Sequence, residues 1–301
     1  MSVVTTATAS RRRGWAALLK SFLLEARPIV LVLFVMRFMV GALESTGAMS
    51  VSRLSLGALA WTFVTAGIYL TNASSDVEAD VINRKNRPLA NGQLTTREVN
   101  AAALVSFGVS VTCAASLGAG SLAIVSLMAI LGTYYSVGWP RPGKAHYATA
   151  AATITVGIFL PYVAGSLANS GSISSPSLWT GIVFAIWAAI AGMSKDFADV
   201  EGDRSTGRRT LPVSLGLRSS AFATGGLAGV FAILLLAIGN RVVPTDGTVV
   251  LVAGVCAFAA ACAVIGARGR QTQAVGLPYR IFVLTQITAN TAIAVVAIGS
   301  Y

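Results

Sequence analysis

The stretch LSLGALAWTFVTAGIYLTNASSDVEAD, residues 54–80, joins an apolar run to a cluster of acidic side chains. Residues 54–70 carry no charge and are long enough for a helix to cross the hydrocarbon of a bilayer. Asp76, Glu78 and Asp80 follow almost at once. The stretch therefore predicts a membrane-spanning helix that ends in carboxylates.

The composition places the whole chain in a membrane. Of its 301 residues, 55% are hydrophobic and only 11% are charged, with a mean hydropathy of +0.73. We expect an all-α fold, with residues 1–27 as an N-terminal segment and residues 28–301 as a single domain of nine spanning helices. The nine apolar runs are 28–43, 54–70, 100–117, 121–137, 148–167, 178–193, 220–239, 249–267 and 279–300.

Basic residues predict the orientation of these spans. Counted by loop, 19 of the 22 Lys and Arg residues fall on the side that carries the N-terminal segment and the two acidic clusters. The excess of basic residues in cytoplasmic loops then makes that side cytoplasmic. Arg11, Arg12 and Arg13 are followed by a mixed segment rather than the apolar core of a signal peptide. Short basic loops without an RNA-binding motif argue against nucleic acid, despite the net charge of +11.

The first acidic cluster has helical spacing. Asn72, Asp76 and Asp80 lie at positions i, i+4 and i+8, so they share one face if the helix continues past the apolar run. Glu78 should point elsewhere. Carboxylates gathered on one face repel each other unless a cation neutralises them. Hard oxygen ligands in this arrangement suit Mg²⁺ held jointly with substrate phosphates.

A second acidic cluster lies 120 residues further on, in MSKDFADVEGD, residues 193–203. Asp196, Asp199 and Asp203 have the spacing i, i+3 and i+7, which predicts one helical face, and Lys195 precedes them. Basic residues follow both clusters and can hold phosphate oxygens: Arg84, Lys85 and Arg87 after the first, Arg204, Arg208 and Arg209 after the second. The alternative is that both clusters are solvated helix ends that merely balance the basic loops.

These motifs resemble those of the UbiA family of intramembrane prenyltransferases. DVINRKNRPLANG, residues 80–92, is similar to the first loop of that family, and KDFADVEGDRSTGRRTLPVSLG, residues 195–216, to the second motif of its chlorophyll-synthase and homogentisate-prenyltransferase members. The resemblance implies a bundle of nine helices around a central cavity. Ala73 departs from it, because many members have Asp directly after the first Asn.

The resemblance also implies roles for individual residues. Asn72, Asp76 and Asp80 would bind one Mg²⁺, and Asp196, Asp199 and Asp203 a second. Arg84, Arg87 and Lys195 would hold the diphosphate of an isoprenyl donor. YYSVGWP, residues 134–140, is similar to the family's segment after the fourth helix and offers Tyr134 or Tyr135.

We therefore expect the chain to ionise an isoprenyl diphosphate and pass the prenyl group to an aromatic or other lipophilic acceptor. Phe159, Tyr162 and Trp187 are candidates to stabilise the allylic cation. The first alternative is a UbiA-type terpene cyclase that quenches the cation without an acceptor. The second is a transporter, because intramembrane acids also mark ion pathways.

Four polar residues in or beside the spans stay open between structure and function. His146 precedes the fifth span, where a loop role is favoured over a general base. Arg37 lies deep in the first span, where a charge is costly, so it should face protein or a cavity. Gln286 and Asn290 lie one turn apart in the last span and can bond a neighbouring helix or an acceptor.

Overall fold

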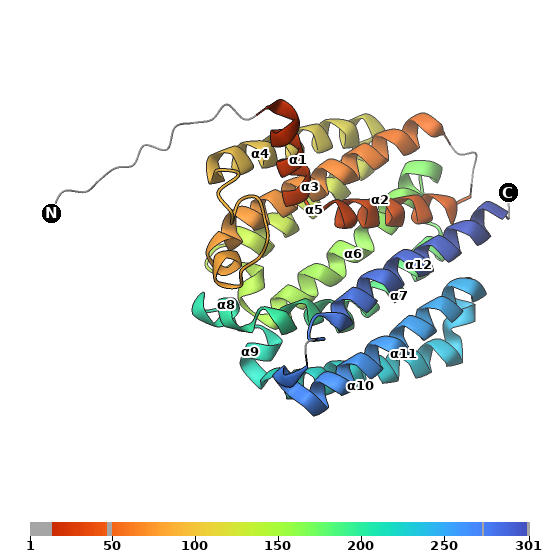
Figure 1. Cartoon of the computed structure of the whole chain (residues 1–301). Coiled ribbons are helices and arrows are strands. Elements are labelled where there is room, and N and C mark those ends of the chain that lie inside the picture. The colour runs from red at the N-terminus through yellow and green to blue at the C-terminus, as the bar shows by residue number, and fades with distance from the viewer. Residues whose placement is uncertain (1–13, 47–49, 273, 300–301) are drawn as a thin grey trace.

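The computed structural model describes residues 14–46, 50–272 and 274–299, except the side chain of Arg270. Arg11, Arg12, Arg13 and the end of the last predicted span at Ser300 lie outside the described residues. Long helices run side by side along the molecule (Figure 1). Across the described part of the chain there is no strand, only an isolated bridge between His146 and Arg209.

The described residues form helices of very different lengths. The α-helices are α1 (Trp15–Glu25), α2 (Pro28–Leu43), α3 (Val51–Ile82), α4 (Thr96–Leu117), α5 (Ala119–Val137), α6 (Tyr147–Ser170), α7 (Ser175–Ala191), α8 (Val200–Ser205), α9 (Leu211–Leu215), α10 (Leu217–Ile238), α11 (Thr245–Arg268) and α12 (Leu277–Gly299). The 3₁₀ turns are η1 (Gly143–Ala145), η2 (Gly192–Ala198), η3 (Gly239–Arg241) and η4 (Gly269–Gln271).

The predicted all-α membrane fold is confirmed. Within the described ranges, eight helices are long and apolar enough to cross a membrane. The predicted first span coincides with α2, but at 16 residues α2 is shorter than the others and bends by 63° from α1. Counting this bent pair as one span gives nine.

Side chains are buried in two large apolar clusters. One lies among α2, α3, α4, α5 and α6 around Trp61, and the other chiefly among α6, α7, α10, α11 and α12 around Trp187. A Cβ atom on Gly41 would lie 2.0 Å from the Tyr162 carbonyl oxygen, and one on Gly165 1.9 Å from that of Phe38. Helices α2 and α6 therefore touch backbone to backbone, as small residues permit in membranes.

The polar loops gather at one end of the bundle, where α8, α9 and the loop after α3 lie together (Figure 1). Thr95 and Glu98 form a reciprocal capping box that ends this loop and starts α4. The buried carboxylate of Glu25 accepts a 2.9 Å hydrogen bond from the Leu89 amide. This contact ties the loop to α1, next to the acidic end of α3.

Candidate active site

The first acidic motif lies on an uninterrupted helix, which is the condition under which the sequence placed its residues on one face. Helix α3 continues to Ile82, so Asn72, Asp76 and Asp80 share one face and all three are buried. The Asn72 side-chain amide donates a 2.6 Å hydrogen bond to Asp76 Oδ2. Glu78 is exposed and points away from this face, also as predicted.

The second motif is not one helical face, so that prediction is wrong. After α7 the chain tightens into η2, which carries Asp196, and Asp199 then separates η2 from α8, which carries Asp203. The Asp199 and Asp203 amides each donate to the backbone oxygen of the preceding acid in the motif. The spacing i, i+3, i+7 fits one α-helix, but here the three aspartates are divided between a 3₁₀ segment, the joint at Asp199 and a short α-helix.

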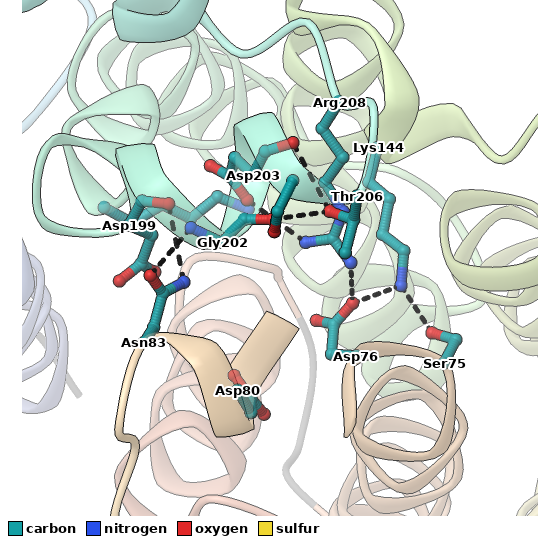
Figure 2. A network of polar contacts seen from close by, with 12 residues as sticks. Ser75, Asp76, Asp80, Asn83, Lys144, Asp199, Gly202, Asp203, Thr206 and Arg208 are labelled. Carbon is teal, nitrogen blue, oxygen red and sulfur yellow. Dashed lines mark hydrogen bonds and ion pairs between the residues drawn. The ribbon is translucent and has the colours of Figure 1, made fainter. Parts of the chain in front are cut away.

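Ion pairs connect the two motifs directly (Figure 2). The Arg208 guanidinium contacts Asp76 through Nη2 and Asp203 through Nη1, the latter at 3.4 Å. Lys144 Nζ lies 2.5 Å from the same Asp76 Oδ1 and also contacts the Ser75 hydroxyl. One carboxylate of α3 is therefore held by two cations, one from η1 and one from the segment after α8.

The other bases pair within the same region. Arg87 Nη1 lies 2.6 Å from Asp80 Oδ2, and Lys85 contacts Asp199 across the two motifs. Lys195 donates to the Tyr135 hydroxyl, with its ammonium 5.0 Å from the centre of that ring.

A neutral contact holds the ends of the two motifs together. Asn83, the C-cap of α3, accepts a 3.0 Å hydrogen bond from the Gly202 amide and donates one of 3.4 Å to the Asp199 carbonyl oxygen (Figure 2). A Cβ atom on Gly202 would lie 2.3 Å from Asn83 Nδ2 and 2.8 Å from the Ala79 carbonyl oxygen. Glycine at position 202 is therefore what lets α8 approach α3 so closely.

Burial shifts the pKa values of site groups outside the spans. It lowers the pKa of Lys144 to about 8, against the opposing effect of Asp76. Burial also raises the pKa of Asp203, which Arg208 counteracts. Because both side chains are buried, a bound anion or cation would act strongly on them.

The acidic motifs open into a cavity of about 390 Å³. Such a volume is within the range of small-molecule sites. Its polar part includes Asn72, Asp76, Asp80, Asn83, Lys85, Arg87, Tyr135, Lys144, Lys195, Asp196, Asp199, Asp203 and Arg208. Its apolar part includes Leu33, Ile68, Met128, Leu131, Ile158 and Val283. Charged groups from distant segments thus share one cavity with an aliphatic wall.

Three predicted site residues lie elsewhere. Arg84 has φ 52° and is exposed, and it lines a separate surface pocket beside Val81 and Asn91. Tyr134 is 39% exposed and is not among the residues that line the cavity. Arg209 is exposed, while its backbone bonds with Ala145 and Tyr147.

The three aromatic candidates for stabilising a cation also stand outside the cavity lining. Tyr162 and Trp187 are fully buried, and Trp187 packs against Phe231, Phe258 and Phe282. Phe159 packs at the edge of the first apolar cluster. The aromatic residues that line the cavity are Phe34, Tyr69, Tyr135, Tyr279 and Phe282.

Lys144 and Asn83 are the residues that the sequence did not point to. Lys144 lies in a short loop after the fourth predicted span, where its charge looks like any other basic loop residue. Asn83 precedes Arg84 and Lys85, whose charges drew the assignment instead. A neutral side chain such as Asn83 that joins two segments by hydrogen bonds gives no signal in the charge or hydropathy of the sequence.

The carboxylates fit a hard divalent cation that is completed by phosphate oxygens. In the described ranges, no three His, Cys, Asp or Glu residues stand close enough to hold a metal by themselves. Mg²⁺, however, is usually bound by one or two carboxylates together with substrate phosphates and water. Buried Asp203 Oδ2 meets no donor within hydrogen-bond distance in the described part of the chain, so it can serve as such a ligand.

Comparison with known proteins agrees with this arrangement. A family model described as the UbiA prenyltransferase family matches residues 29–284. A digeranylgeranylglyceryl phosphate synthase of Methanoculleus marisnigri is 31% identical over 223 residues, or 73% of this chain and 77% of that protein. One from Methanopyrus kandleri is 29% identical over 203 residues, or 66% of this chain and 70% of that protein.

A solved structure shows the same fold. The UbiA homologue of Archaeoglobus fulgidus, bound to GPP and Mg²⁺, superimposes with a TM-score of 0.66 at 20% identity, covering 91% of this chain and 99% of that one. The match over most of the chain, the helical bundle and the paired acidic motifs lead to one conclusion. The chain belongs to the UbiA prenyltransferase family.

Proposed function

We propose that this prenyltransferase binds an isoprenyl diphosphate together with Mg²⁺ at its acidic motifs and transfers the prenyl group to an aromatic or other lipophilic acceptor. One observation carries the proposal. Carboxylates and bases from α3, η1, η2 and α8 line a cavity whose lining also includes many aliphatic and aromatic side chains. An isoprenyl diphosphate, with a charged head and an apolar chain, matches both kinds of lining.

The bases of the site would change partners when the donor binds. Lys144, Arg208 and Arg87 now neutralise Asp76 and Asp80, and each carries further N–H donors that can reach phosphate oxygens. We propose that Asn72, the five aspartates of the two motifs and the diphosphate together would hold two Mg²⁺ ions. These ions would stabilise the negative charge of the leaving group. Lys195, fixed by Tyr135, would add a further cation at the second motif.

The apolar part of the cavity would hold the prenyl chain and keep water from the reacting carbon. Leu33, Ile68 and Leu131 offer no nucleophile to an allylic cation, so its capture is left to the acceptor. The protons lost by the acceptor can pass to the released diphosphate. We also propose that this end of the bundle faces the cytoplasm, because the basic loops gather there.

The proposal is tested with the full chain in lipid nanodiscs, by following both diphosphate release and prenyl transfer from geranylgeranyl diphosphate. Asp76→Ala and Asp196→Ala should each slow diphosphate release by about a hundredfold or more. Glu78→Ala and Glu201→Ala are matched controls, because both acids are exposed and neither lines the cavity. They should keep wild-type rates.

The products decide between transfer and cyclisation. Prenylated acceptor that requires both the donor and added Mg²⁺ supports the proposal. A cyclised hydrocarbon or alcohol formed without acceptor would favour the terpene cyclase. Wild-type rates in both aspartate variants would overturn the assignment of the site.

A further inference from the structure

Glu25 is a buried acid that the proposed chemistry does not use. It is the last residue of α1, is 1% exposed and is not among the residues that line the cavity. Its Oε2 accepts the 2.9 Å hydrogen bond from the Leu89 amide, while Oε1 meets no donor among the described residues. In the same ranges no ion pair joins Glu25 to a base. A buried carboxylate costs free energy that a neutral acceptor would avoid.

Leu89, the partner of Glu25, is attached to the end of α1 in a second way. Its side chain is buried in an apolar cluster that also contains Ala26. Leu18 and Phe22 of α1 pack against the same cluster. The loop after α3 is therefore held against α1 both by a hydrogen bond and by side-chain packing.

The chain between Leu89 and Arg87 is stiff. Pro88 separates them, and its ring fixes its own φ and restricts the backbone of the residue before it. The Arg87 carbonyl oxygen accepts a 2.9 Å hydrogen bond from the Asn91 amide, and that of Pro88 one of 2.7 Å from the Gln93 amide. Because this turn is closed by its own hydrogen bonds, a shift of Leu89 must move the backbone of Arg87 with it.

Arg87 carries this position into the cavity. Its side chain lines the cavity, where Nη1 lies 2.6 Å from Asp80 Oδ2. Burial and the charge of Arg27 lower the pKa of Arg87, whereas the charges of Asp80 and Glu25 oppose this shift. Glu25 thus favours the charged form of Arg87, although the two described side chains form no ion pair with each other.

We propose that Glu25 is a positioning residue for the donor, which holds Arg87 through Leu89 at the place where the diphosphate binds. The inference rests on the proposed function, because Arg87 acts on the diphosphate of that same site. When the donor binds with Mg²⁺, Asp80 becomes a metal ligand and Arg87 loses its present partner. The contact between Glu25 and Leu89 lies outside the cavity lining. It therefore persists through this exchange and keeps Arg87 directed at the phosphate oxygens.

The test measures donor binding without any acceptor, in the full chain in nanodiscs. The probe is geranylgeranyl S-thiolodiphosphate, a donor analogue whose C–S bond resists ionisation, and calorimetric titration at fixed Mg²⁺ gives its Kd. Glu25→Met fills similar space but removes both oxygen atoms, so the Kd should rise by about tenfold. Glu25→Gln retains an acceptor for the Leu89 amide and should stay within about threefold of the wild type.

Double variants ask whether Glu25 acts through Arg87. In an Arg87→Ala background, Glu25→Met should cause no further loss, because the two residues act as one unit. In an Arg208→Ala background, which removes a base of the second motif, the tenfold loss should persist. Ser21→Ala is the matched control on α1, since that hydroxyl donates to the Ala17 carbonyl oxygen of its own helix. It should keep the wild-type Kd.

The outcomes separate the two proposals. An unchanged Kd in Glu25→Met, an equal loss in Glu25→Gln, or a further tenfold loss in the Arg87→Ala background would overturn this inference alone. The last result would mean that Glu25 supports the fold as a whole. Analogue binding that depends on neither Asp76 nor added Mg²⁺ would overturn the proposed function as well. A loss in Glu25→Met that disappears in the Arg87→Ala background, with Ser21→Ala unchanged, would identify Glu25 as the residue that positions Arg87.

Discussion

The two acidic motifs present similar carboxylates on different supports. The first lies on α3, a helix of 32 residues in which Asn72, Asp76 and Asp80 follow one another at regular turns. The second is divided between η2, a joint at Asp199, and the six residues of α8. The first is positioned by its own helix, whereas the second depends on contacts with α3.

Those contacts show which motif sets the geometry. Arg208 reaches from the second motif to Asp76, and Asn83 at the end of α3 bonds the backbone at Asp199 and Gly202. A long helix embedded in the bundle can serve as a fixed reference. The short turns of the second motif can then be adjusted against it.

The largest expected effect contrasts equivalent acids from the two supports. Asp80→Ala removes a buried carboxylate from α3 and leaves Arg87 without its partner, so prenyl transfer should fall by about a hundredfold or more. Asp199→Ala removes a half-exposed acid at the joint and should cost about tenfold. Initial rates with saturating Mg²⁺ measure both. Equal losses would contradict the different weight given to the buried Asp80 and the more exposed Asp199.

The next prediction concerns the close contact between Asn83 and Gly202, which holds the two motifs together. Gly202→Ala places a Cβ atom against Asn83 and the Ala79 carbonyl oxygen, so α8 must move away from α3. We expect the Mg²⁺ concentration for half-maximal rate to rise by about tenfold. Gly226→Ala is the control, because a Cβ atom there meets nothing within 4 Å. An unchanged Mg²⁺ requirement in Gly202→Ala would show that this contact does not position the second motif.

Glu44 is a largely buried acid that no base among the described residues faces. It caps the C-terminus of α2, accepts a 2.7 Å hydrogen bond from Thr180, and burial raises its pKa to about 7 from 4.5. Because the folded protein holds the proton more tightly, stability from this group is present below pH 4.5 and is lost as the pH rises through 7. Glu44→Gln should therefore stabilise the protein at pH 8 by about 1 to 3 kcal/mol.

Thermal unfolding in detergent between pH 4.5 and 8 measures this effect. The difference in stability between Glu44→Gln and wild type should grow with pH across that window. Asp246→Asn is the control, since Asp246 is exposed. A constant difference between Glu44→Gln and wild type would contradict the raised pKa.

The smallest expected effect concerns the outer ion pair of the two motifs. Lys85 and Asp199 are 31% and 23% exposed, so their attraction is weakened by solvent. Lys85→Ala should lower the transfer rate by only about two- to threefold. Arg87→Ala, which strips the partner from buried Asp80, should lower it more in the same assay. A larger loss in Lys85→Ala would indicate that Lys85 contacts the donor itself.

The sequence was informative where local periodicity controls structure. Hydropathy located the spans, and the spacing of Asn72, Asp76 and Asp80 placed them on one face provided that the helix continued past the apolar run, because side chains four apart share a face. The same rule failed for Asp196, Asp199 and Asp203. Their spacing also fits a helix, but contacts with α3, distant in sequence, stabilise a joint at Asp199 instead.

The remaining site residues depend on tertiary contacts that leave no local pattern. Arg84 was expected in the site beside Arg87, yet its positive φ turns it outward. Lys144 reaches Asp76 from a loop 68 residues away, and nothing near Lys144 in the sequence distinguishes it from other basic loop residues. Charge clusters therefore predicted where the site lies better than they predicted which residues form it.

The ion pairs around Asp76 affect the way in which the site can bind Mg²⁺ and the donor. Lys144 and Arg208 already form ion pairs with that carboxylate. A divalent ion that bound alone would take their partner and leave both bases unpaired in a poorly solvated place. A diphosphate arriving alone would leave the aspartates uncompensated in turn. Simultaneous arrival lets every charge exchange one partner for another, which makes metal and donor strongly synergistic ligands.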